Sequence, residues 1–266
     1  MVESPFNALD IIAASRSYEV TFRQPLSQTA TQEFALGLTA SRRESDTALL
    51  DLPFRLSAGA DRNGRTQVSA LRFFQELTQR SSQQVLALRS QFSFGVAPFA
   101  LTANDNPADS FFLSWRGQGQ YVNLLAPDTL FLFRADIQLA DRSLVPIEQF
   151  GLGGQESVRG YRQDFLLGDN GVAATAELRL PILRVPEVQG VLQLAPFLDL
   201  GTVWNSSGKP NPSPNTLFGI GVGLRYQQSD RLTARIDYGI PVVSVGSNKR
   251  TAQESGLYFS IIYNPF

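Results

Sequence analysis

The sequence predicts an all-β protein, an antiparallel transmembrane β-barrel, and three observations support this fold class. Apolar and polar residues alternate with a period of two along the chain of 266 residues. The alternating segments are about 10 residues long or longer, which is the length of a tilted membrane strand. Tight and long connections alternate between them, as expected for the two rims of an outer-membrane barrel.

The first half of the chain supplies strands of simple alternation. In SYEVTFRQPL, the side chains of Tyr18, Val20 and Phe22 share one face, while Glu19 and Arg23 lie on the other. The segment EFALGLTASRRES repeats this period. The strands predicted in this half cover about 17–26, 31–45, 65–78, 82–95 and 109–124.

The second half adds charged pairs in the middle of the polar faces. These pairs are Arg134 with Asp136, Glu177 with Arg179, and Arg235 with Asp237. Charges at mid-strand fit a water-filled lumen better than the dry core of a sandwich. The strands predicted here cover about 128–142, 170–182, 190–204, 215–228, 230–241 and 256–266.

A soluble all-β sandwich is the alternative fold, since it also alternates and spaces its turns regularly. The strand lengths favour the barrel, because strands in soluble sheets are most often about 5–6 residues long. No linker, charge block or low-complexity segment divides the sequence. Residues 1–266 are therefore predicted to form a single barrel domain.

The composition argues against several classes of function. The chain has no cysteine and no histidine, so thiol nucleophiles, Ser-His-Asp triads and the usual soft-metal sites are excluded. We therefore expect no enzyme, no cofactor and no metal. A formal net charge of −1 offers no basic surface to nucleic acid. The N-terminus has no signal-peptide pattern, and no apolar run approaches the ~18 residues of a transmembrane helix.

A glycine-rich stretch, GLGGQESVRGYRQD at 151–164, lies in the long connection predicted at 143–169. Its glycines Gly151, Gly153 and Gly154 would let the chain turn tightly. A phosphate-binding loop is disfavoured, because the stretch lacks the G-x-x-x-x-G-K-[ST] pattern and no helix follows it. An ordinary flexible loop is the simplest interpretation of this stretch alone.

A second stretch, APFLDLGTVW, lies on a predicted strand. Phe197, Asp199 and Gly201 are spaced by two residues, so their side-chain positions share one face. Further along, GIGVGL at 219–224 alternates glycine with apolar residues. This alternation fits a barrel strand that faces a crowded interior.

The two stretches together resemble a known superfamily. VRGY resembles the loop tip, and FLDLG the F-x-D-x-G strand motif, of the outer-membrane superfamily of two-partner secretion transporters and barrel-assembly proteins. Within it, FGLGGQESVRGYRQD is most similar to the haemolysin secretion/activation family ShlB/FhaC/HecB. The motifs occur in order, separated by one strand and followed by three more strands to a C-terminal Phe. The resemblance covers nearly the whole chain, as the C-terminal part of a longer protein.

The resemblance implies a structural site inside the barrel. The long loop would fold back into the lumen, where the guanidinium of Arg159 would meet the carboxylate of Asp199, with Gly160 allowing close approach. A buried guanidinium needs such a carboxylate in fork geometry. Phe266 would serve as the C-terminal assembly signal. The residues of the implied lumen latch are Val158, Arg159, Gly160, Tyr161, Phe197, Asp199 and Gly201.

The resemblance also sets expectations for the extent of the chain. The family barrel has about sixteen strands, of which this chain would supply about eleven. The first strands, the POTRA domains and the signal peptide are expected to be absent. The lipid-facing side of the last strand is left open, because Ser260 shares the face of Phe266, whereas Leu257 and Phe259 lie on a more apolar face.

The function implied by the resemblance is a pore in the bacterial outer membrane that translocates a partner exoprotein in two-partner secretion. A barrel-assembly protein or insertase of the same superfamily and a general diffusion porin are the alternatives. The implied partners are the secreted exoprotein, outer-membrane lipid and the barrel-assembly machinery.

Overall fold

The structure, a computed structural model, describes residues 11–50, 52–55, 59–96, 111–206, 209–245 and 251–264. Its long strands are β1 (Ile11–Gln28), β2 (Gln32–Leu49), β4 (Arg65–Arg80), β5 (Gln84–Gly95), β6 (Leu113–Ala126), β7 (Thr129–Ala140), β10 (Asn170–Val185), β11 (Gly190–Trp204), β12 (Thr216–Gln228), β13 (Leu232–Pro241) and β14 (Leu257–Tyr263). Short elements are β3 (Leu52–Pro53), β8 (Phe150–Leu152), β9 (Leu166–Gly168) and the 3₁₀ turns η3 (Pro146–Glu148) and η4 (Pro186–Val188).

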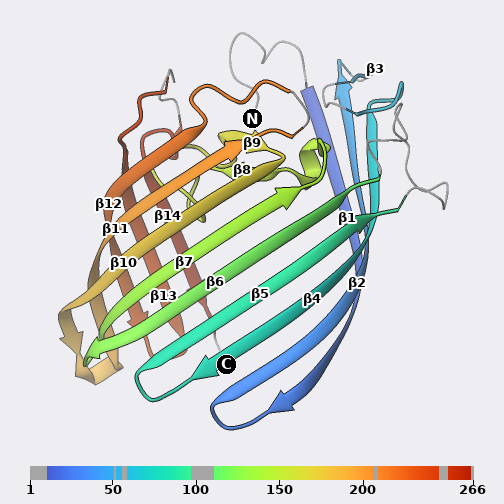
Figure 1. The fold of residues 1–266 in the computed structure, drawn as a ribbon. Helices are drawn as coiled ribbons and strands as arrows, with labels where there is room; N and C mark the ends of the chain where they lie inside the picture. Colours follow the sequence, from blue (N-terminus) through green and yellow to red (C-terminus); the bar gives the residue numbers. More distant parts are fainter. Residues whose placement is uncertain are drawn as a thin grey trace.

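The long strands form one antiparallel sheet in the order of the sequence. This 12-stranded sheet runs β1-β2-β4-β5-β6-β7-β10-β11-β12-β13-β14, with β3 paired to β2, and its strands are tilted side by side (Figure 1). Strands β8 and β9 pair separately with each other. No helix in the described ranges is long and apolar enough to cross a membrane. The predicted all-β antiparallel fold is confirmed.

The predicted strands are all present, with some differences in length. β1 and β2 extend further than predicted because they pair with each other along their whole length, from Ile11 opposite Leu49 to Gln28 opposite Glu33. The connection predicted as a loop at 143–169 contains the turn η3 and the pair β8 and β9. These short elements lack enough residues for a recognisable period in the sequence.

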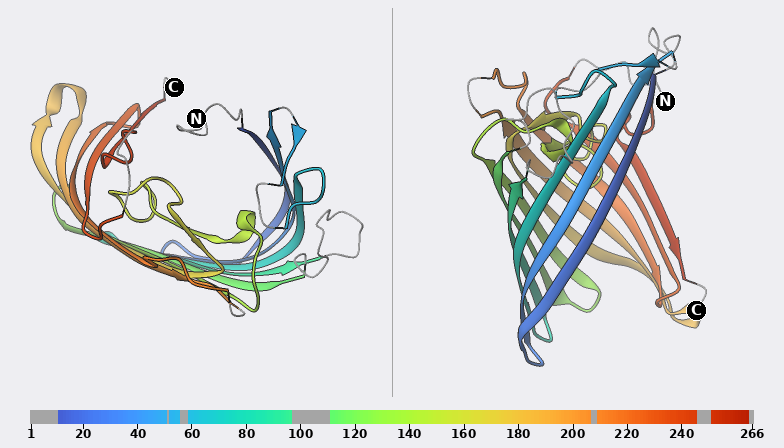
Figure 2. Two further views of the ribbon diagram at one scale, coloured as in Figure 1. Left: turned by 90° about the horizontal axis from the view of Figure 1, so that it is seen from above. Right: turned by 90° about the vertical axis from the view of Figure 1, so that its right-hand side faces the viewer.

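The sheet curls into a trough, and the segment between β7 and β10 lies on its concave side (Figure 2, left). β1 and β14 are the two edges, and no pairing joins them within the described residues. The curled sheet therefore presents a convex outer face and a concave inner face. The described part is an open portion of a barrel wall.

The outer face is apolar. On β13, the side chains of Ile236 and Tyr238 are exposed outward, whereas Asp237 between them is completely buried. On β14, Phe259 is 71% exposed and Tyr258 only 3%. This contrast shows that the more apolar face of the last strand is the outer one. Phe266 lies outside the described residues, so its role as an assembly signal stays a prediction.

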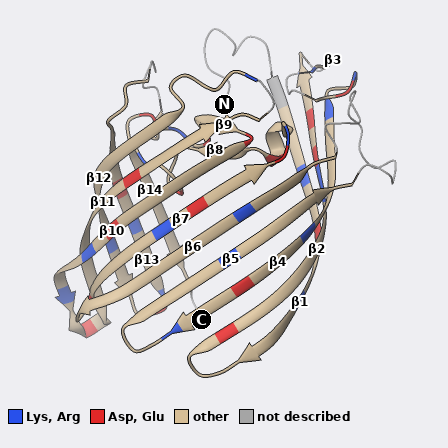
Figure 3. Cartoon of the chain, viewed as in Figure 1, with Lys and Arg blue, Asp and Glu red and all other residues tan. Residues whose placement is uncertain are grey.

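The inner face carries charges of both signs. Positions of both signs occur within the lengths of the strands and not only at their ends (Figure 3). On this face Arg116 of β6 pairs with Asp136 of β7, with 2.6 Å between Nη2 and Oδ2. An apolar outside combined with a charged inside is the arrangement of a transmembrane barrel.

Candidate functional site

The inner loop, residues 141–169 between β7 and β10, is the main feature of the concave side (Figure 2). It passes through η3 and β8, forms a tip at residues 153–165, and returns through β9. The pairing of Leu152 with Leu166 closes the tip at its base. Cross-strand pairing therefore gives this loop a defined shape although it connects two strands of the wall.

Glycines set the turn into the tip. Gly153 and Gly154 have φ angles of +114° and +98°, which residues with a side chain rarely adopt. A Cβ on Gly153 would lie 2.6 Å from the carbonyl oxygen of Arg162. The hydroxyl of Ser157 also donates a hydrogen bond to the Gly153 carbonyl at 3.0 Å. The turn therefore requires glycine at these positions.

Arg159 projects from the tip into the wall and is completely buried. Its Nε and Nη2 atoms donate to Oδ2 and Oδ1 of Asp199 on β11, at 2.7 and 2.8 Å. Its backbone N–H also donates to Asp199 Oδ2 at 3.0 Å. The side chains of the two motifs thus meet in the fork geometry that suits a guanidinium and a carboxylate.

Two further carboxylates surround the same guanidinium. Arg159 Nη1 donates to Glu177 Oε2 of β10 at 2.8 Å and to Asp237 Oδ1 of β13 at 3.4 Å. Arg225 of β12 joins these two acids, with Nη2 at 3.0 Å from Glu177 and 2.6 Å from Asp237. Sequence reasoning did not assign these residues to the site. The charged pairs at mid-strand were the signal that could have found Glu177 and Asp237.

The ring of Phe197 lies beneath the guanidinium, with 3.3 Å between Arg159 Cζ and the ring centroid. A cation over an aromatic face adds attraction without competing for the carboxylates. Burial lowers the pKa of Arg159, but the hydrogen bonds and charges of Asp199 and Glu177 outweigh this effect and raise the pKa above its ordinary value. The guanidinium therefore stays charged in the site.

The tip approaches the wall so closely that glycine is needed on both sides. Gly160 has a φ of +102°, and a Cβ there would lie 2.8 Å from the backbone nitrogen of Pro241. On the wall, a Cβ on Gly239 would lie 2.6 Å from the backbone nitrogen of Gly160, and one on Gly219 would overlap the carbonyl oxygen of Arg159. These wall glycines form the surface on which the tip rests.

Val158 and Tyr161 belong to an apolar cluster beside the charges. The cluster joins the loop to β10, β11 and β12 and contains Phe150, Leu152, Val158, Tyr161, Leu166, Ala173, Val203 and Leu217. The Tyr161 hydroxyl reaches past it, 3.0 Å from the carbonyl oxygens of Phe218 and Val243. Gly201 leaves room for Leu152, since a Cβ there would overlap that side chain. Of the predicted aromatic residues, Phe197 contacts the guanidinium directly, while Tyr161 packs in this cluster.

Tyr258 of β14 is a further contact of the tip that sequence reasoning missed. Its hydroxyl donates to the carbonyl oxygen of Tyr161 at 2.5 Å and accepts from the N–H of Gly160 at 3.0 Å. A buried hydroxyl on the last strand thus binds the backbone of the tip. No motif in the sequence marks this residue.

We expect Tyr258→Phe to lower the free energy of unfolding by about 1–3 kcal/mol, because it leaves the Gly160 N–H and the Tyr161 carbonyl without this partner. Urea titration of the protein in detergent micelles measures the change. Tyr263→Phe is the control, since Tyr263 lies on the same strand with an exposed side chain. Equal stability of the two variants would contradict the contact.

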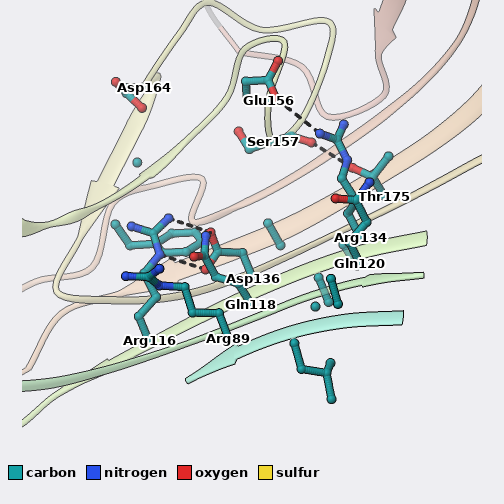
Figure 4. A pocket seen from close by; sticks show the side chains of 18 of the residues that line it. Arg89, Arg116, Gln118, Gln120, Arg134, Asp136, Glu156, Ser157, Asp164 and Thr175 are labelled. Atoms are coloured by element: carbon teal, nitrogen blue, oxygen red, sulfur yellow. Dashed lines mark hydrogen bonds and ion pairs between the residues drawn. The ribbon is translucent and has the colours of Figure 1, made fainter. Parts of the chain in front are cut away.

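A polar cavity of about 810 Å³ lies between the inner loop and strands β4 to β7 and β10 (Figure 4). Positively and negatively charged side chains both line it. The Arg134 guanidinium donates a hydrogen bond to Glu156 of the tip at 3.2 Å. The hydroxyl of Thr175 donates to the carbonyl oxygen of Ser157 at 3.3 Å. Within the described ranges, no group of three or more metal-ligating side chains is placed to hold an ion.

Comparison with known proteins identifies relatives. The model of the haemolysin secretion/activation protein family ShlB/FhaC/HecB matches residues 1–226. The outer membrane transporter CdiB of Escherichia coli O6:K15:H31 (strain 536 / UPEC) is 29% identical over 133 residues, which is 50% of this chain and 22% of the relative. CdiB of Dickeya dadantii (strain 3937) is 28% identical over 146 residues, or 54% of this chain and 26% of the relative. The chain therefore matches about a quarter of these relatives' length.

Solved structures share the fold. CdiB from Escherichia coli superposes with a TM-score of 0.76 at 20% identity, over 94% of this chain and 45% of that one. BamA from Haemophilus ducreyi lacking POTRA domains 1–3 gives 0.61 at 12% identity, over 94% and 54%. The fold is that of an outer-membrane barrel, and the resemblance predicted from the two motifs is confirmed. The chain belongs to the haemolysin secretion/activation protein family ShlB/FhaC/HecB.

Proposed function

We propose that this chain forms the pore part of an outer-membrane transporter that passes a partner exoprotein outward in two-partner secretion. The family match over residues 1–226 carries this proposal. The charged concave face provides a wet path for an unfolded chain, and the apolar convex face, with exposed side chains such as Phe259 and Ile236, contacts outer-membrane lipid. No catalytic step is needed for this activity.

Within this pore, the inner loop acts as a latched gate or plug. The proposed latch consists of the VRGY tip and the FLDLG strand. It is supported by the two hydrogen bonds between Arg159 and Asp199 and by the stacking of Arg159 on Phe197. Because these groups are buried, removing one partner of the pair costs more stability than it would for an exposed ion pair.

The function is tested in the bacterium that encodes the protein. Deletion of its gene is expected to stop the appearance of the partner exoprotein in the culture medium, and the intact gene supplied in trans restores it. The amounts of unrelated outer-membrane barrels, measured in the same membranes, stay unchanged. Normal secretion after deletion would refute the proposal.

Barrel assembly is the second candidate function, and the likeness of the fold to BamA is the observation that favours it. In the same deletion experiment, a barrel-assembly function predicts a change in the unrelated barrels. Deletion would then lower the amounts of several unrelated barrels in the membrane, and any loss of the exoprotein from the medium would follow from that defect.

A further inference from the structure

We infer that the inner loop is held to the wall by two separate anchors, and that Arg72 and Glu148 form the second one. Arg72 is then a positioning residue that holds the proximal arm (residues 143–149), while Arg159 holds the tip. The effect of this anchor on transport rests on the proposed function, but its existence does not.

The second anchor is a buried ion pair. Arg72 of β4 donates through Nη2 to Oε1 and Oε2 of Glu148 in η3, at 2.7 and 2.9 Å. The side chains of Arg72 and Glu148 are 8% and 4% exposed, so neither charge is compensated by bulk water. A buried pair of this kind is costly to break from one side, because the remaining charge is left without its partner.

The wall is built to hold this guanidinium in place. Arg72 Nε donates to the hydroxyl of Ser41 on β2 at 3.1 Å, and Nη1 donates to the hydroxyl of Ser93 on β5 at 2.9 Å. The strands on either side of β4 thus orient the arginine toward the loop. Arg43 adds a weaker contact, with 3.5 Å between its Nη1 atom and Glu148 Oε1.

The two anchors have opposite polarity and contact different parts of the wall. At the tip, the loop supplies a cation, Arg159, to carboxylates on β10, β11 and β13. At the proximal arm, the loop supplies an anion, Glu148, to a cation on β4. No side chain is shared between the two sets of contacts in the described structure.

The chain between the anchors allows them to act independently. β8 lies between the arm and the tip, and the tip begins at Gly153 and Gly154, both at positive φ. The base of the loop is closed by Asp169, whose Oδ1 accepts from the N–H of Leu144 at 2.8 Å. We therefore expect loss of the tip anchor to free the tip while the arm stays bound, and loss of the arm anchor to have the reverse effect.

Single introduced cysteines can measure the two parts separately, because residues 1–266 contain no cysteine. Val145→Cys reports on the arm and Val158→Cys on the tip, since these valines are 3% and 0% exposed. Each is made in the full-length protein in isolated outer membranes and labelled with a membrane-impermeant maleimide. Labelling rates reflect how often each buried site opens.

Arg72→Ala is expected to raise the labelling rate at position 145 by about tenfold or more and to change that at 158 by less than about twofold. Arg159→Ala is expected to raise the labelling rate at position 158 and to leave that at position 145 nearly unchanged. Arg89→Ala is the matched control: Arg89 pairs with Glu76 on the neighbouring strand, and within the described residues no hydrogen bond or ion pair joins either side chain to the inner loop. It should leave both rates unchanged.

Charge reversal separates anchoring from general damage to the fold. Arg72→Glu alone should open the arm, and Arg72→Glu combined with Glu148→Arg should restore protection at position 145. Equal opening of both positions in Arg72→Ala, no opening at all, or no rescue in the double variant would each overturn the inference. The labelling does not depend on any exoprotein. It therefore tests the second anchor independently of the secretion experiment that tests the proposed function.

Discussion

Arg159→Ala is expected to abolish secretion of the partner exoprotein, and to do so more severely than Asp199→Ala. The reason is an asymmetry in the site. Within the described residues, every hydrogen bond that the Asp199 carboxylate accepts comes from Arg159. Removal of the arginine side chain therefore leaves a completely buried carboxylate without its charged partner, a loss of about 3–5 kcal/mol. Removal of the aspartate leaves Arg159 with Glu177 and Asp237.

The amount of exoprotein in the medium, with the transporter quantified in the membrane, measures these effects. The combined variant Arg159→Ala with Asp199→Ala should be less damaging than the sum of the two single variants, because no lone charge remains at that position. Arg184→Ala is the control, since Arg184 pairs with Asp128 at the end of β10 that lies away from the inner loop. Normal secretion by both single variants would refute the role of the latch.

Gly239→Ala should impair secretion without altering any charge. Its Cβ would lie 2.6 Å from the backbone nitrogen of Gly160 and 2.8 Å from the carbonyl carbon of Arg159. Backbone atoms cannot rotate away as a side chain does, so the tip must lift from the wall or the strand must shift, at a cost of about 1–3 kcal/mol. Lifting the tip by even a few tenths of an ångström lengthens the hydrogen bonds between Arg159 and Asp199.

Gly119→Ala is the matched control for this prediction. Gly119 also lies on a wall strand, but a Cβ there would meet only the end of the Leu88 side chain, at 3.3 Å. Secretion and stability to urea should therefore fall in Gly239→Ala and stay close to the unmodified protein in Gly119→Ala. If the two variants behave alike, close seating of the tip on Gly239 does not matter for transport.

The alternation of the sequence was sufficient to predict the strands. A period of two places side chains on opposite faces of a strand wherever its neighbours lie, so this signal is local. The length of the strands and the charges at mid-strand favoured a barrel with a wet interior, and the structure has that antiparallel, charge-lined sheet. The short elements η3, β8 and β9 were missed, because they are too short to show a period.

The candidate site depended on more than local pattern. The residues of the two motifs were named through resemblance to a family, and the structure brings Arg159 and Asp199 together although 40 residues separate them. Glu177 and Asp237, at 18 and 78 residues from Arg159, were visible only as charges on strands. Tyr258 gave no signal, since a tyrosine on the last strand is equally suited to the outer surface.

By itself, the sequence determined the fold class, the strands and the face on which most residues lie, because these follow from spacing along one chain. Tertiary structure alone decided which inner-face charges meet and where the inner loop binds. The pairs Arg72–Glu148 and Arg159–Asp237 join residues 76 and 78 positions apart, on elements that become neighbours only when the sheet curls. The curvature of the sheet places the concave faces of distant strands around one loop. No local pattern of residues specifies how closely those faces approach the loop.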